Sequence, residues 1–137
     1  MAGMEKLRQG LQIMRIAMLI GIALYVYIIL HVPSEAKPDP FLFWIMVVLA
    51  ISMVGGLFVV RRVLVSPAVE VLRTQPDDAR ARHRWWNGNM ITYAFCEAIA
   101  LYGVVLHFLG SSGKDVAPFF IAGAGLLLVF PPRIPES

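Results

Sequence analysis

The chain has 137 residues, of which 58% are hydrophobic and 15% are charged. Soluble domains average about 25% charged residues, and the apolar residues of this chain fall into long blocks. This composition excludes an ordinary soluble domain and predicts an all-α integral membrane protein. The net charge is +3, but the basic residues flank the apolar blocks, where they normally set topology. We therefore expect a lipid bilayer as surroundings and no nucleic acid as partner.

The apolar blocks predict one domain, residues 1–137, with four transmembrane helices. A helix needs about 20 apolar residues to cross the roughly 30 Å hydrocarbon core. The predicted spans are 11–32, 41–60, 90–109 and 116–130. A polar, basic connector, 61–89, joins the second span to the third. The fourth span is short for a full crossing.

The distribution of Lys and Arg predicts the orientation. The two turns that follow the first and third spans hold only Lys37 and Lys114, whereas the N-terminal arm, the connector and the tail hold the other basic residues. Under the positive-inside rule both termini are cytoplasmic. An even number of spans leads to the same arrangement, and we expect a bacterial-type inner membrane.

Glu97 is the only acid inside a predicted span. An acid at this depth is usually protonated, paired or lining a polar cavity, and it is a functional-site candidate by default. Ser52 lies at a similar predicted depth in the second span, so its hydroxyl is a candidate partner for the protonated acid. Cys96, the one cysteine, is interpreted as a core residue, and the small residues Ala122 to Gly125 as a helix-packing face.

Short segments recur along the chain. Ile22-Ala23-Leu24-Tyr25 reappears as Ile99-Ala100-Leu101-Tyr102, and Pro40-Phe41 reappears as Pro118-Phe119. This echo indicates two duplicated helical hairpins. Chance matches between apolar segments are the alternative, and the sequence leaves both open.

Two motifs resemble a known family. Arg73-Thr74-Gln75-Pro76 resembles a cytoplasmic turn, and Ala94-Phe95-Cys96-Glu97-Ala98 followed by Tyr102-Gly103 resembles a carboxylate-bearing helix. Both features, within residues 41–110, resemble the proteolipid (c-ring) subunit of rotary ATP synthases and vacuolar-type ATPases. The resemblance implies that Glu97 carries a proton, with Ser52 and Tyr102 in the same ion-binding site.

A second function remains open beside proton transport. The chain is then an accessory or scaffold subunit of a membrane complex, in which Glu97 is a structural hydrogen-bonding group. Either function leads us to expect other membrane subunits or self-association as partners. The sequence shows no catalytic triad, phosphate loop or metal-ligand spacing, so we predict no enzyme and no metal.

Two further groups of residues have alternative interpretations. A basic and aromatic group either binds anionic lipid head groups or only fixes topology; it consists of Arg80, Arg82, Arg84, Trp85 and Trp86. His31 and His107 fall near the same membrane boundary, where two imidazoles could bind a haem or metal. Interfacial histidines without a ligand are the simpler interpretation, so we predict no cofactor.

Overall fold

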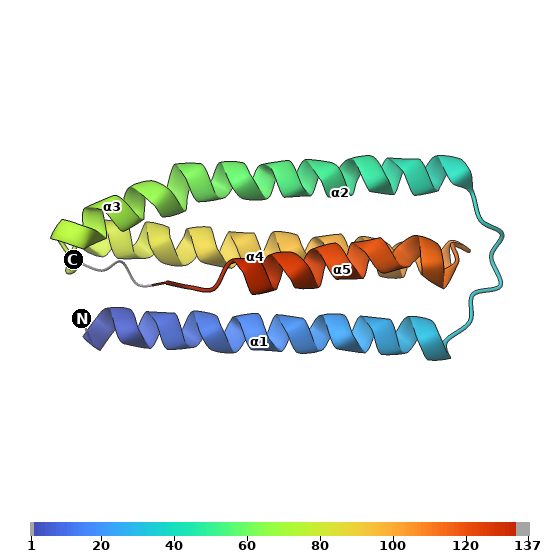
Figure 1. The fold of residues 1–137 in the computed structure, drawn as a ribbon, viewed down its shortest axis with the longest axis horizontal. Helices are drawn as coiled ribbons and strands as arrows, with labels where there is room; N and C mark the ends of the chain where they lie inside the picture. Colours follow the sequence, from blue (N-terminus) through green and yellow to red (C-terminus); the bar gives the residue numbers. More distant parts are fainter. Residues whose placement is uncertain (1, 134–137) are drawn as a thin grey trace.

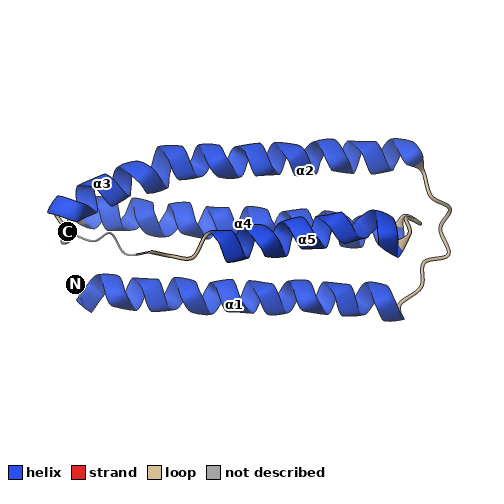
Figure 2. Cartoon of the chain, in the orientation of Figure 1, coloured by secondary structure: helices blue, strands red, loops and turns tan. Residues whose placement is uncertain are grey.

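A computed structural model describes residues 2–133 of the chain. Its elements are α1 (Ala2–His31), α2 (Pro40–Val60), the π-helical turn η1 (Arg61–Val65), α3 (Ser66–Thr74), α4 (Ala79–Phe108) and α5 (Gly113–Val129). Because α2, η1 and α3 follow one another without a break, the described residues form four rods (Figure 1), and Figure 2 shows helices and loops but no strand among them. The all-α prediction is confirmed. Three rods, namely α1, α2 to α3, and α4, are long and apolar enough to cross a membrane.

Helix α4 is the centre of the bundle. It packs against α1, α2, α3 and α5, and α1 also packs against α5. Figure 1 shows α1 and α2 on opposite sides of the α4 and α5 pair. Consequently α1 and α2 present large apolar side chains to the outside, among them Ile13, Ile20, Leu24, Trp44 and Val48. Such an apolar exterior is what a bilayer requires of a helix surface.

The bundle has two different ends. We call the end with the loops 32–39 and 109–112 the loop end, and the end with the start of α1 and α4 the terminal end (Figure 1). At the loop end the Ser34 hydroxyl donates to the Phe108 carbonyl at 3.0 Å. Gly110 has φ of +100° and lies directly against the backbone of residues 36–38, so a side chain there would be both strained and blocked.

The predicted connector 61–89 is mostly helical. The chain stays helical to Thr74, turns over residues 75–78, and begins α4 at Ala79. Asp78 caps α4 by accepting a hydrogen bond from the Ala81 amide at 2.8 Å. The π-helical turn η1 precedes Pro67, whose ring nitrogen has no proton to donate to a regular helix.

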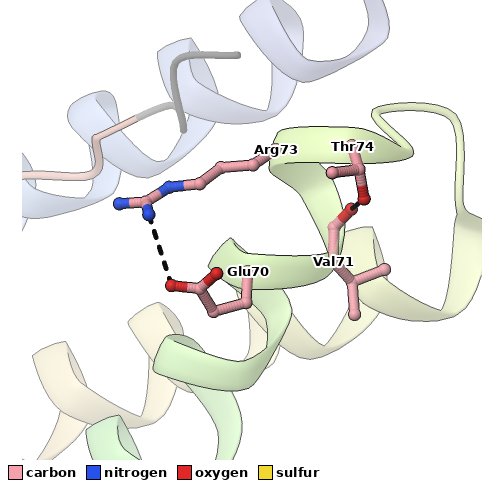
Figure 3. Close-up of polar contacts among 4 residues, drawn as sticks. All are labelled: Glu70, Val71, Arg73 and Thr74. Carbon is pink, nitrogen blue, oxygen red and sulfur yellow. Dashed lines mark hydrogen bonds and ion pairs between the residues drawn. The ribbon is translucent and has the colours of Figure 1, made fainter.

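Helix α3 is amphipathic, which explains why a polar segment forms a helix. Its inner side buries Ala68 and Leu72, and its outer side carries the ion pair of Arg73 with Glu70 at 3.3 Å (Figure 3). The Thr74 hydroxyl donates to the Val71 carbonyl at 3.3 Å, so the motif that resembles a cytoplasmic turn coincides with the end of this helix (Figure 3).

The predicted small-residue face on α5 is confirmed at Gly123. A Cβ atom at Gly123 would lie 2.8 Å from the Cys96 carbonyl oxygen and 3.2 Å from the Ala100 Cβ, whereas one at Gly125 would meet nothing within 4 Å. Cys96 itself is fully buried, as expected of a core residue. Helices α4 and α5 therefore pack closely at Gly123, because glycine has no side chain to hold them apart.

Candidate functional site around Glu97

Glu97 lies on the side of α4 that faces α1. A Cβ atom built on Gly21 of α1 would be only 2.9 Å from the Glu97 Oε1 atom. One turn further along α1, the Tyr25 hydroxyl lies within interaction range of the same carboxyl group. The backbone of α1 thus passes directly over the carboxyl group, and the glycine leaves the room that this group occupies.

The second carboxyl oxygen of Glu97 has no partner. Oε2 is buried and accepts no hydrogen bond from any described residue. The ion pairs among the described residues are Glu5 with Arg8 and Glu70 with Arg73, both near the terminal end and away from Glu97. Burying an ionised carboxylate without a partner costs several kcal/mol or more. The surroundings of Glu97 therefore leave one carboxyl oxygen without the partner that a buried polar atom normally has.

The structure does not pair Glu97 with either of its two predicted partners. The Ser52 side chain is exposed on α2, and its hydroxyl donates to the Val48 carbonyl of its own helix at 2.8 Å. Tyr102 is partly exposed on α4 and makes no side-chain hydrogen bond within the described residues. Gly21 and Tyr25, which contact Glu97, were missed by the sequence analysis. The available signal was an isolated glycine inside an apolar helix, which usually has a packing reason.

A polar layer lies below Glu97, toward the terminal end. The Tyr93 hydroxyl donates to the Phe130 carbonyl at 3.0 Å. Arg61 donates from Nη1 to Asn89 Oδ1 at 3.4 Å, and its guanidinium carbon lies 4.3 Å from the centre of the Phe130 ring. This layer brings one arginine from the end of α2 onto the buried face of α4.

A second arginine approaches the same layer from α1. Arg15 donates from Nη1 to the Leu127 carbonyl at 3.5 Å, while its buried Nε atom has no partner among the described residues. Arg15 and Arg61 are both close enough to Tyr93 to act on it electrostatically. Two positive charges therefore lie between Glu97 and the terminal end. On the other side of Glu97 the next buried residues of α4, Ile99, Ala100 and Leu106, are apolar, and the buried polar side chain of His107 follows only at the loop end.

The basic and aromatic group at the start of α4 is divided between surface and core. Arg80 and Arg84 are exposed, as a lipid-binding or topology-setting role requires. Trp85, however, is 1% exposed, so its ring packs inside the bundle and does not face lipid head groups. Trp86 is half-buried beside Gly10 of α1. The pattern was misread because a tryptophan pair on a helix points to two different sides.

The guanidinium group of Arg82 lies beside Gly3, at the start of α1. Arg82 is partly exposed, and it contacts the start of α1 near the terminal end.

The two histidines use their rings for backbone contacts. His107 is nearly buried, and its Nε2 atom lies 2.6 Å from the Val32 carbonyl oxygen, which joins α4 to the end of α1. His31 is exposed and stacks on Tyr27 with ring centres 4.2 Å apart. Among the described residues no three His, Cys, Asp or Glu side chains gather as a metal site would need.

Comparisons with known proteins gave no match: no family model, no curated protein and no solved structure is similar to this chain.

Proposed function

We propose that the chain is a small subunit of a bacterial-type inner membrane with four transmembrane helices and both termini in the cytoplasm. In this proposal Glu97 takes up and releases a proton within the bilayer, as in a proteolipid-like subunit. The fourth span is α5, which packs along α4 but is shorter than the other three rods. Its shortness is tolerable because a short span can thin the bilayer locally or lean on its neighbours.

The observation that carries the proposal is the unpartnered, buried Oε2 atom of Glu97. An acid without a partner inside a membrane span is a candidate functional site by default, and in this proposal it exchanges its proton when a polar or charged group reaches it. Arg15 and Arg61 lie on its terminal side, where they favour the carboxylate that release of the proton to water would leave.

Helix α1 acts as the cover of Glu97 in this proposal. The resemblance to proteolipid subunits implies a carboxyl group that meets lipid, whereas here Gly21 of α1 lies against it. Proton exchange then requires a small displacement of α1 from α4.

The contact between Glu97 and Tyr25 favours a second candidate function. These side chains join α1 to α4, and a polar contact between helices in lipid stabilises by about 0.6–2 kcal/mol. In this alternative the chain is an accessory or scaffold subunit, and Glu97 holds the bundle together without exchanging protons.

A hydrophobic carbodiimide tests the first function. This reagent modifies protonated carboxyl groups that are accessible from the membrane. The purified protein should be modified at Glu97, as located by peptide mass spectrometry, and the rate should fall as pH rises. Glu97→Gln is the matched control, because it keeps the shape of the side chain and removes the reactive group.

Folding and size of the Glu97→Gln protein separate the two functions. A proton carrier should keep its fold and its particle size in mild detergent after this substitution. An unreactive Glu97, together with loss of folding or assembly in Glu97→Gln, would contradict proton exchange and support the structural function. A closed ring of several copies would further support a proteolipid-like subunit, whereas a monomer or dimer would argue against one.

A further inference from the structure

An apolar groove of about 370 Å³ runs between α2 and α5. Its walls come from Val47, Ile51 and Val54 of α2 and from Phe119 and Ala122 of α5. Apart from one acid at the rim of the loop end, its lining side chains are apolar. A groove of this kind on the outside of a membrane bundle suits a hydrocarbon chain.

A second cavity, of about 300 Å³, lies between the same two rods at the terminal end. It is lined by Arg61, Arg133 and Asn89, together with Trp85 and Phe130. Its other lining residues are apolar, so the two arginines and the asparagine distinguish this cavity from the groove. The two spaces share no lining residue, and Phe130, which lines the second cavity, stacks edge-on against Phe58 of α2 with ring centres 5.8 Å apart. We call the groove and this cavity together the crevice between α2 and α5; it is apolar at the groove and carries arginines at the terminal end.

The charges at the two ends of the crevice are opposite. Asp39 and Asp115 line a smaller cavity at the loop end, whereas Arg61 and Arg133 line the cavity at the terminal end. No described acid forms an ion pair with Arg61, whose one side-chain hydrogen bond goes to Asn89. Asn89 and the Phe130 ring compensate the desolvation of this half-buried guanidinium group only in part, because neither carries a negative charge. The basic end therefore favours an anionic group, and the acidic end repels one.

The spacing between the basic cavity and the groove matches one lipid leaflet. Ten residues separate Arg61 from Ile51 along the helix, which corresponds to about 15 Å at 1.5 Å per residue. Half of the roughly 30 Å hydrocarbon core has the same length. A head group at Arg61 would thus place its acyl chain along the lower part of the groove.

We infer that the crevice between α2 and α5 is a binding site for an anionic phospholipid. The phosphate binds at Arg61 and Arg133, and one acyl chain lies in the apolar groove over Ile51 and Ala122. Arginine suits this role because its planar group donates two parallel hydrogen bonds to a phosphate. The site goes beyond the proposed proton chemistry: it shares Arg61 with that proposal but does not use Glu97.

Native mass spectrometry of the purified full chain tests this site. The protein is offered equal amounts of phosphatidylglycerol and phosphatidylcholine in mild detergent, and the bound lipids are counted. We expect a preference for phosphatidylglycerol that falls about fivefold in Arg61→Gln. Arg62→Gln is the matched control, since it removes the same charge from the neighbouring, exposed position and should leave the preference within about twofold.

Two further variants test the position of the lipid. Ala122→Phe fills the groove and should reduce phosphatidylglycerol binding, whereas Ala23→Phe adds the same ring to an exposed site on α1 and should not. Arg133→Gln, in the segment after α5, should reduce the preference as Arg61→Gln does and is the reserve if the latter fails to fold.

Three outcomes would overturn the site. The first is an equal loss of lipid preference in Arg61→Gln and Arg62→Gln, which would mean that surface charge alone attracts the lipid. The second is unchanged lipid binding in Ala122→Phe. The third is displacement of phosphatidylglycerol by millimolar inorganic phosphate, which would identify the ligand as a free anion rather than a lipid.

Discussion

At the scale of single residues, Gly123 and Gly125 of α5 form a matched pair for testing how closely α4 and α5 pack. Gly123→Ala places a methyl group against the Cys96 carbonyl oxygen, so α5 must move away, and we expect a loss of about 1–3 kcal/mol of stability. Gly125→Ala has free space and should be neutral or slightly stabilising, because alanine favours helix. Thermal unfolding in detergent measures both. Equal melting temperatures for the two variants would contradict the close contact at Gly123.

The candidate site could be predicted from sequence only in part. Glu97 stands out because it is the one acid in an apolar run, and this signal needs no knowledge of helix packing. Its neighbours depend on how α4 is rotated about its axis, which a helix that is buried on several sides does not reveal. The pairing with Ser52 assumed that α2 faces the acid, whereas the structure places α1 there through Gly21.

At the scale of elements, the cap of α4 decides where the connector ends. Asp78 accepts from the Ala81 amide, whereas the neighbouring Asp77 is exposed in the turn. Asp78→Ala should therefore cost about 0.5–2 kcal/mol of stability, and Asp77→Ala should stay within about 0.5 kcal/mol of the unchanged protein. Chemical denaturation in detergent, followed by helical circular dichroism, compares them. The cap would be unimportant if both variants unfolded at the same denaturant concentration.

The elements were more predictable than their ends. Long apolar runs specify helices by length alone, so the second predicted span, 41–60, is nearly the extent of α2. The ends of α2 and α4 within the connector are harder to predict, because α3 and the first turns of α4 are amphipathic helices made of polar and basic residues. These two segments are stabilised by packing against each other, which buries Ala68 and Leu72 of α3 and Trp85 of α4. Tertiary packing of this kind has no short-range signal in the sequence.

At the scale of the whole molecule, the proposed orientation can be tested with single cysteines in a Cys96→Ala background. Lys114→Cys lies at the loop end and His83→Cys at the terminal end, and both positions are exposed. In intact cells a membrane-impermeant maleimide should label Lys114→Cys and leave His83→Cys unlabelled. After permeabilisation both should react. Labelling of His83→Cys alone in intact cells would contradict the proposed topology and indicate the opposite orientation.

The central place of α4 has a consequence for how the protein enters its membrane. Of the three helices that are apolar enough to cross a membrane, α4 is the least apolar and has the largest share of buried residues. It also follows α1 and α2 in order of synthesis. When α4 leaves the ribosome, α1 with Gly21 is already made. Glu97 can therefore pass from the aqueous insertion machinery directly into contact with α1, without first facing lipid. We expect this order of the helices to ease the insertion of Glu97, whose Oε2 atom is buried.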